Sequence, residues 1–210
     1  MSTLLLVRHC ETALNSSERY WGHTDVKLGA LGIEQAERVR DLLATERIDI
    51  IFSSNLERAW KTAEIIASRH KVGVITCAEL KEVNFGELEG LTFKEISQRY
   101  PEVAKSWVEG KTEMKYPGGE SLSELAERAS NFTRRLKNVS PEQTVLIVAH
   151  SGVLRLLICH LMDIGQENWW RFKLDFASLS VMETNSRGAI LRSLNNISHL
   201  GGINCVKNVS

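Results

Sequence analysis

The sequence predicts an α/β fold: a three-layer α/β/α sandwich with a mostly parallel sheet and a C-terminal hairpin. Short, largely apolar runs alternate with segments of helical periodicity over residues 3–162. That alternation is typical of a parallel sheet with helices on both faces. Two β-rich runs then flank Asn-Ser-Arg-Gly at 185–188, a turn sequence that indicates an antiparallel hairpin.

Six runs are predicted to be strands. The run at 144–149, Thr-Val-Leu-Ile-Val-Ala, is apolar without alternation, as expected of a strand buried on both faces. The others are short and rich in apolar or β-branched residues, and the last two form the hairpin. The six are 3–8, 48–53, 72–76, 144–149, 178–184 and 189–194.

Apolar residues at helical spacing predict helices over 28–47, 56–68 and about 150–162. Two more helix starts are marked by Thr92 and Ser121, each followed by Glu three residues later. In this capping-box pattern, the hydroxyl and the carboxylate satisfy backbone N–H groups of the first turn. With no long linker and no internal repeat, we expect one domain over 1–200 and a tail over 201–210.

The composition narrows the class of protein. The 210 residues are 43% hydrophobic and 25% charged, and 26 basic residues balance 26 acidic ones. This balance argues against bulk attraction to nucleic acid or to an anionic membrane. Four scattered cysteines without a Cys-x-x-Cys pair argue against a zinc site or a disulfide framework. We also expect a cytoplasmic location, because no run resembles a signal peptide or a membrane span.

Polar clusters follow three of the predicted strands. Arg8 and His9 come after the first, Arg58 opens the helix after the second, and His150 follows the strand at 144–149. Ligands of parallel α/β sheets bind beyond the carboxyl ends of the strands, so one edge can collect all three clusters. Guanidinium groups pair with phosphate oxygens, and a helix N-terminus favours an anion. A phosphoryl group is the expected occupant.

Five segments, in order, resemble the histidine phosphatase superfamily in its phosphoglycerate-mutase-like branch. They read RHCETALN, GHTDVKLGALGIEQA, SSNLERAWKTA, LKEVNFGELEG and AHSGVLR, at 8–15, 22–36, 53–63, 80–90 and 149–155. The resemblance implies that His9 attacks phosphorus and forms a phosphohistidine. It implies that Arg8, Arg58 and His150 hold the phosphoryl oxygens and that Glu82 acts as general acid and then base, without a metal or other cofactor.

Further residues of these segments are expected to bind substrate. Asn15 would donate a hydrogen bond to the phosphoryl group, and Trp21 would contact the leaving group. The other three expected substrate-binding residues are Thr12, Gly22 and Ser151. Ser151 does not fit a serine hydrolase, because its flanks are not Gly-x-Ser-x-Gly.

Cys10 stands where the family usually has glycine. It is not the nucleophile of a cysteine phosphatase, because such a loop needs an arginine six residues after the cysteine and Ser16 is there instead. If the position needs φ > 0, Cys10 is strained; if not, its thiol fills space beside His9. We expect the neighbouring Arg8 and Arg58 to lower the pKa of the thiol and make it oxidisable.

The expected activity is phosphomonoester hydrolysis of a small phosphorylated metabolite. RYWGHTDVKL and NWWRFKLDFASLSVM, at 19–28 and 168–182, are similar to α-ribazole phosphatases, which favours α-ribazole 5′-phosphate as substrate. A cofactor-dependent phosphoglycerate mutase, a broad-specificity or sugar-bisphosphate phosphatase, and a catalytically inactive phosphate-binding domain are the alternatives. A homodimer is left open.

Overall fold

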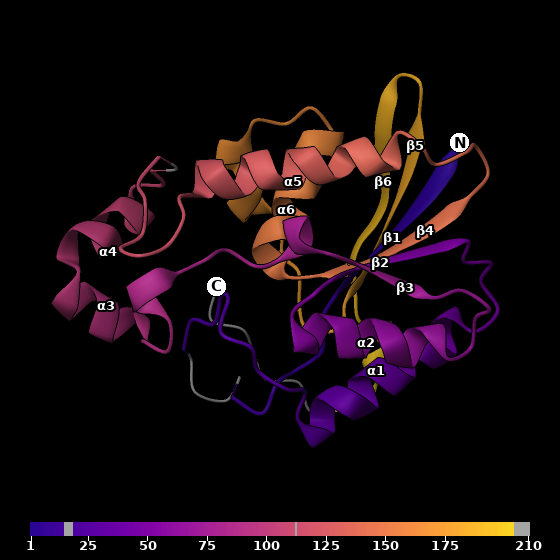
Figure 1. Ribbon diagram of the computed structural model, residues 1–210, viewed down its shortest axis with the longest axis horizontal. Helices are drawn as coiled ribbons and strands as arrows, with labels where there is room; N and C mark the ends of the chain where they lie inside the picture. Colours follow the sequence, from indigo (N-terminus) through magenta and orange to yellow (C-terminus); the bar gives the residue numbers. More distant parts are fainter. Residues whose placement is uncertain (15–18, 112, 204–210) are drawn as a thin grey trace.

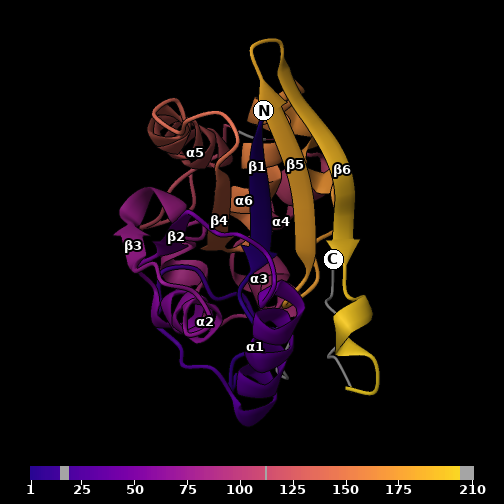
Figure 2. The same cartoon turned by 90° about the vertical axis from the view of Figure 1, so that its right-hand side faces the viewer.

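The computed structural model describes residues 1–14, 19–111 and 113–203. Its centre is a six-stranded sheet in the order β3-β2-β4-β1-β5-β6 (Figures 1 and 2). Strands β1 to β4 are parallel, and β5 and β6 add an antiparallel hairpin at one edge. The bounds are β1 (Ser2–Arg8), β2 (Ile50–Ser54), β3 (Val74–Cys77), β4 (Thr144–Ala149), β5 (Leu179–Asn185) and β6 (Gly188–Asn196). The predicted mostly parallel sheet with a C-terminal hairpin is confirmed.

Helices cover both faces of the sheet (Figure 1). α1 (Ala30–Leu43) and α2 (Glu57–Ala67) lie on one face, and α5 (Leu122–Leu136) and α6 (Ser151–Leu161) lie on the other. The alternation of β1 fits these layers. Leu4 and Leu6 are buried in the cluster that holds the apolar residues of α5 and α6, whereas Leu5 and Val7 are buried against α1 and α2. The predicted three-layer α/β/α sandwich is therefore correct.

Two short helices, α3 (Phe93–Arg99) and α4 (Pro101–Val108), extend away from the sheet between β3 and α5 (Figure 1). The start of α4 is not among those predicted from the sequence. Tyr100 leaves the helical conformation at φ −134°, ψ 62°, and Pro101 opens the next helix at a position that needs no N–H donor. A residue before proline is disfavoured in the α region, which explains the break between the two helices.

Both predicted capping boxes are present, at the starts of α3 and α5. The bounds of α1 are less well predicted. It begins after Gly29, which is extended, and closes where the N–H of Ala44 bonds to the oxygen of Asp41, so it is shorter than 28–47. The β2 and β3 strands start two residues later than predicted. Short 3₁₀ turns complete the chain: η2 (Ala78–Leu80), η3 (Gly86–Leu88), η4 (Gln166–Arg171) and η5 (Ser198–Leu200).

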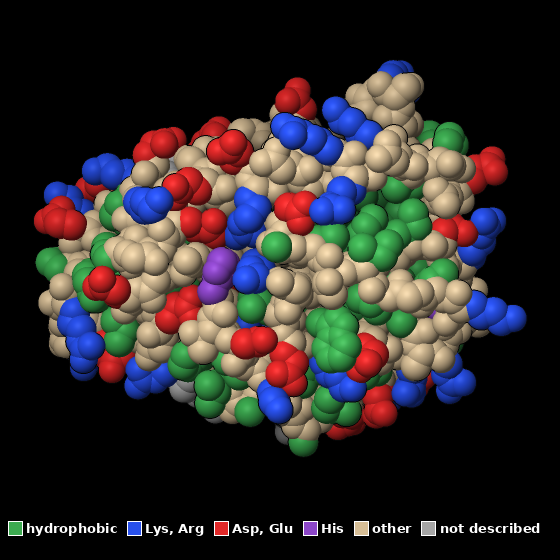
Figure 3. Space-filling view, in the orientation of Figure 1, with side chains coloured by type: hydrophobic (Ala, Val, Ile, Leu, Met, Phe, Trp, Pro, Cys, Tyr) green, Lys and Arg blue, Asp and Glu red, His purple; other side chains and the backbone are tan. Residues whose placement is uncertain are grey.

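The surface carries both signs of charge. Acidic and basic side chains are interspersed over the face in Figure 3, and neither sign dominates it. Among the residues described, no helix has the length and apolar character needed to cross a membrane. The tail predicted over 201–210 lies mostly outside the described residues, which end at 203.

Candidate active site

Segments far apart in the sequence meet where β1, β2 and β4 end. His9 directly follows β1 and His150 directly follows β4. Because these strands pair in parallel with Arg8 opposite Ala149, the two histidine rings lie side by side, with centroids 4.9 Å apart. Arg58 reaches His150 from the first turn of α2, which follows β2. The structure thus brings the three polar clusters to one edge of the sheet.

His9 is buried and oriented by its own backbone. Its Nδ1 lies 2.7 Å from the carbonyl oxygen of Cys10. A carbonyl only accepts hydrogen bonds, so Nδ1 carries the proton and Nε2 keeps its lone pair. Burial, followed by the charges of Arg58 and Arg8, holds the pKa of His9 well below its usual value. The imidazole is therefore neutral at neutral pH, with Nε2 available as a nucleophile.

Arg58 is almost completely buried, and its donors point to three acceptors. Nη2 donates to the oxygen of Gly22 at 2.6 Å, Nη1 to the oxygen of Thr24 at 3.0 Å, and Nε to Nδ1 of His150 at 3.3 Å. Because Nδ1 of His150 accepts, its Nε2 carries the proton and donates to Oγ of Ser54 at 2.9 Å. Burial and then Arg58 hold the pKa of His150 well below its usual value.

The backbone that receives Arg58 is itself fixed by a carboxylate. Glu89 accepts from the N–H groups of His23 and Thr24, both at 2.6 Å. Gly22 fits tightly, because a Cβ at this position would lie 2.1 Å from the oxygen of Val83. Gly22 therefore contributes a carbonyl that orients Arg58, in a position where only glycine fits. From the sequence, Glu89 is one of three glutamates, with Glu79 and Glu87, that compete with Glu82 for the role of acid, and its contact with this backbone was not predicted.

Arg8 lies on the other side of His9, against an aromatic ring. Its Nη1 donates to the oxygen of Leu174 at 2.6 Å, and its guanidinium carbon lies 3.7 Å from the centroid of Phe176. Its Nε is buried and has no hydrogen-bond partner within the described part of the chain. Burial lowers the pKa of Arg8 to about 10, so the group stays charged at neutral pH. A buried cation with an unused donor is suited to bind an anion.

A third arginine belongs to the same cluster, although sequence reasoning missed it. Arg155 lies four residues after Ser151 on α6, and residues at this spacing share a helix face. Its Nε is also buried without a partner among the described residues, and its guanidinium lies 5.5 Å from the centroid of Trp169. Burial lowers the pKa of Arg155, while the charges of Glu82 and Asp175 oppose that shift. The signal was the arginine that ends AHSGVLR.

Glu82 reaches this cluster from the loop after β3. One carboxylate oxygen accepts from the N–H of Gly152 at 3.1 Å, at the N-terminus of α6, and the other accepts from the N–H of Val83 at 3.0 Å. Its charge opposes the lowering of the pKa of Arg8 and of Arg58 by burial. The cluster therefore places one carboxylate among several cations and two neutral histidines, an arrangement suited to a phosphate group.

The remaining expected substrate-binding residues differ in their surroundings. Thr12 is buried and forms a backbone bridge with Leu28. Ser151 is half-buried as the first residue of α6, next to His150. Trp21 is half-buried, with its Nε1 enclosed and without a hydrogen-bond partner in the described chain. Asn15 lies outside the described residues.

The expectation of a reactive thiol at Cys10 is wrong. Cys10 is completely buried, and burial raises the pKa of its thiol to about 12, which outweighs the effect of a hydrogen bond with Thr62. Its φ is not positive, so the position carries no left-handed strain. Cys10 thus fills space beside the nucleophile candidate, packed in the cluster that includes Val7 and Val148.

The fold and this cluster of histidines and arginines define a class of phosphate-transferring protein, and comparison with known families agrees. Residues 4–197 match the histidine phosphatase superfamily, branch 1, and the chain belongs to that family. It is a phosphoric monoester hydrolase.

Two relatives of similar identity are named for different substrates. Phosphoserine phosphatase 1 of Hydrogenobacter thermophilus is 34% identical over 96% of this chain and 95% of its own. The adenosylcobalamin/α-ribazole phosphatase of Escherichia coli is also 34% identical, over 91% of this chain and 95% of its own. The crystal structure of a putative α-ribazole-5′-P phosphatase from Escherichia coli superposes with a TM-score of 0.87 at 34% identity, covering 93% of this chain and 96% of that one.

Proposed function

We propose that this phosphatase hydrolyses a small phosphorylated metabolite through a phosphohistidine on His9. The observation that carries the proposal is the state of the His9 ring. Nδ1 is held by the carbonyl of Cys10, 2.7 Å away, and the low pKa keeps Nε2 unprotonated. A nucleophile needs a free lone pair, and Nε2 has one because no proton is bound to it.

In the first step, Nε2 of His9 forms a bond to phosphorus as the bond from phosphorus to the leaving oxygen breaks. Arg8 and Arg58 hold the phosphoryl oxygens, where charge is spread in the transition state, and His150 joins them when its Nε2–H turns from Ser54 to a phosphoryl oxygen. Arg58 has five N–H groups and uses three on Gly22, Thr24 and His150, so among the described residues two remain for the substrate. The proposal requires Glu82 to enter this step protonated, and its carboxyl gives the proton to the leaving oxygen.

In the second step, water attacks phosphorus and the bond to Nε2 breaks. The Glu82 carboxylate, left ionised by the first step, takes the proton from the attacking water. Inorganic phosphate leaves, and Nε2 of His9 recovers its lone pair. Both enzyme groups return to their starting state. The Glu82 carboxyl therefore serves as acid and then as base with no net change.

We propose α-ribazole 5′-phosphate as the substrate. Aromatic faces adjoin the cationic cluster: Phe176 lies against Arg8 and against the His9 ring, and Trp169 lies near Arg155. The half-buried Trp169 offers an aromatic face for a flat, apolar base carried next to the phosphate. A relative that is named for this substrate supports the choice.

Phosphoserine is the second candidate, and Arg155 favours it. The enclosed Nε of Arg155, without a partner among the described residues, suits a carboxylate on the leaving group. A phosphoserine phosphatase matches over a similar length and at the same identity.

A phosphate-release panel in EDTA tests the substrate. It contains α-ribazole 5′-phosphate, phosphoserine, 3-phosphoglycerate, fructose bisphosphates and nucleotides, each measured as kcat/KM. We expect α-ribazole 5′-phosphate to be best by at least about tenfold, the discrimination that one well-used pocket contact provides. A higher kcat/KM for phosphoserine would select the second candidate.

Two controls belong to the same panel. His9→Ala should release no phosphate above background from any substrate, and retained turnover would refute His9 as the nucleophile. Incubation of 3-phosphoglycerate with a bisphosphate primer distinguishes a mutase. Isomerisation faster than phosphate release would contradict the hydrolase assignment.

A further inference from the structure

Glu82 lies in a loop rather than in a helix or strand, and the guanidinium of Arg128 binds the backbone of that loop. Nη1 of Arg128, from α5, donates to the backbone oxygens of Glu79 and Lys81, both at 2.8 Å. Nη2 donates to the oxygen of Glu82 itself at 3.2 Å. Three carbonyls from four consecutive residues thus converge on one guanidinium.

A carboxylate completes this arrangement. Nη2 of Arg128 pairs with Glu120 at 2.6 Å, and Nε points to the second carboxylate oxygen at 3.4 Å, so all five N–H groups are engaged. Glu120 also accepts from the N–H of Asn84 at 2.8 Å, and its own N–H donates to the oxygen of Asn84 at 3.0 Å. The loop is therefore fixed on both sides of Glu82.

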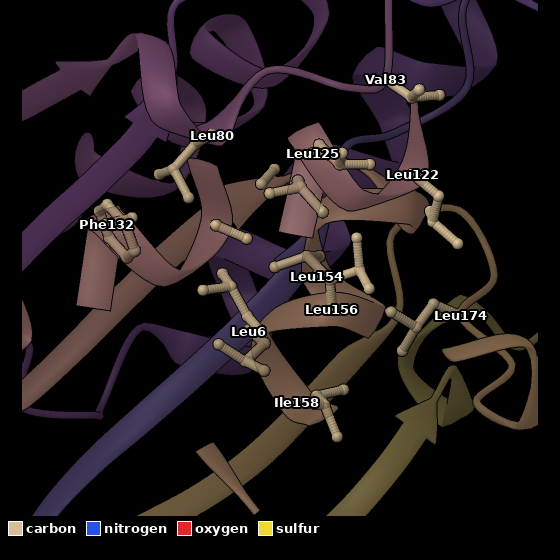
Figure 4. Packing of buried hydrophobic residues seen from close by; sticks show 14 of the residues in the cluster. Leu6, Leu80, Val83, Leu122, Leu125, Phe132, Leu154, Leu156, Ile158 and Leu174 are labelled. Carbon is tan, nitrogen blue, oxygen red and sulfur yellow. The ribbon is translucent and has the colours of Figure 1, made fainter. Parts of the chain in front are cut away.

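Apolar contacts with α5 also hold this loop in place. Leu80 and Val83 are buried against α5, beside Leu125 and Leu122 (Figure 4). With Leu80 and Val83 packed and the carbonyls turned to Arg128, the Glu82 side chain points to α6, where it meets the N–H of Gly152. A Cβ on Gly152 would lie 2.4 Å from that carboxylate, so the space for Glu82 is closely limited.

We propose that Arg128, paired with Glu120, is a positioning residue that sets the Glu82 carboxyl for proton transfer to the leaving group. The proposal rests on the proposed function, in which Glu82 is the acid and then the base. Within the described residues, the hydrogen bonds of Arg128 go to the backbone oxygens of the loop and to Glu120, so Arg128 positions Glu82 through the loop. A lysine cannot replace it, because one ammonium cannot span three carbonyls and a bidentate carboxylate.

A displaced acid should slow the hydrolysis of some esters more than that of others, according to the leaving group. Esters with a poor leaving group need the proton, whereas esters with a very good one leave without it. Phenyl phosphate and 2,4-dinitrophenyl phosphate have similar shapes and differ in this need. For Arg128→Leu, we expect kcat/KM to fall roughly 30- to 100-fold on phenyl phosphate and less than about threefold on the dinitrophenyl ester, the loss expected of a misplaced group.

A second readout separates positioning from general damage. Hydrolysis of the phosphohistidine needs Glu82 as base whatever the leaving group was. On the dinitrophenyl ester, Arg128→Leu should therefore show a burst of dinitrophenol followed by a slower steady rate, with kcat lowered more than kcat/KM. Arg128→Lys and Glu120→Gln, which disturb the packing less, should give the same pattern in weaker form.

The matched control is Arg135→Leu. Arg135 lies on the same helix and pairs with the side chain of Glu79, in the same loop, at 2.8 Å on the surface. Removing this exposed ion pair should leave kcat/KM on both substrates within about twofold of the parent enzyme. Circular dichroism and thermal melting establish that each variant is folded at the assay temperature.

The outcomes separate this proposal from the one on which it rests. Glu82→Gln, measured in parallel, should show the same dependence on the leaving group. Suppose that Glu82→Gln shows this dependence, but that in all the Arg128 and Glu120 variants kcat/KM falls equally on both esters or on neither. The positioning role of Arg128 is then overturned, while the acid role of Glu82 stands. If kcat/KM of Glu82→Gln falls equally on both esters, the assignment of Glu82 as the acid is wrong, and the positioning role of Arg128 is wrong with it.

Discussion

At the scale of single residues, burial decides the chemistry of the site more than charge does. His9 and His150 are enclosed with Arg58, and burial is the largest cause of their low pKa values, ahead of the neighbouring charges. Cys10, which follows His9 in the chain, has its pKa raised to about 12 for the same reason. A thiol and an imidazole respond in opposite directions, because burial disfavours the thiolate and the imidazolium alike.

The two histidines should make the fold sensitive to mild acid. Their pKa values in the folded state lie below the unfolded value of about 6.5, so as pH falls below about 6.5 the unfolded chain takes up protons that the folded chain does not. The free energy of unfolding should therefore decrease from pH 7.5 to pH 5, by up to about 1.4 kcal/mol per pH unit for each such histidine. Urea unfolding at intervals of half a pH unit measures this slope.

His150→Gln provides the control for that slope. It removes one of the two buried imidazoles, so its slope should be shallower, while His23, His70 and His199, whose pKa values are also lowered by burial, keep part of the effect. Equal slopes for both proteins would contradict the lowered pKa, because they would show that His150 takes up its proton over the same pH range in the folded and the unfolded chain.

At the scale of elements, the positions of functional groups follow from where strands and helices begin and end. Arg8 is the last residue of β1, Ser151 the first of α6, and Arg58 lies in the first turn of α2. These positions are readable because apolar periodicity is a local property of the sequence. The break at Pro101 is equally local, and its proline was the signal for the helix start that was not predicted.

The capping box of α5 should contribute measurable stability. The Ser121 side chain accepts from the N–H of Glu124, and Glu124 accepts in return from the N–H of Ser121. Ser121→Ala removes one of these bonds at the end of the helix that carries Arg128, and should lower the free energy of unfolding by about 1 kcal/mol. Urea denaturation at neutral pH measures it.

Glu127→Ala is the matched substitution, on an exposed position within the same helix. Alanine is a strong helix former, so this change should stay within about 0.5 kcal/mol of the parent. Equal losses for both variants would assign the effect to the helix in general rather than to its cap.

At the scale of the whole molecule, topology explains why so much of the site could be predicted. Four residues, Arg8, His9, Arg58 and His150, lie at or just after the ends of strands that are neighbours in the sheet. The rule that the carboxyl ends of parallel strands meet at one edge needs only the order of these strands. Glu82 could be named only through the family resemblance, because nothing local in a loop of several glutamates distinguishes it.

The unpredicted part of the site depends on contacts between distant segments. Glu89 holds the loop that receives Arg58, and Arg128 holds the loop that carries Glu82, across 46 residues of sequence. Neither has a periodic or local signature. The burial of Cys10 likewise follows from packing between β1 and the helices α1 and α2, which a sequence pattern does not specify.

One measurement tests the central claim most directly, namely that His9 carries the phosphoryl group during turnover. The enzyme is quenched in alkali, which preserves phosphohistidine, during turnover of 2,4-dinitrophenyl phosphate, and its peptides are mapped by mass spectrometry. We predict one phosphoryl group, on His9, and none in His9→Ala. A phosphoryl group on Cys10 or His150, or sustained turnover with none on His9, would contradict the account.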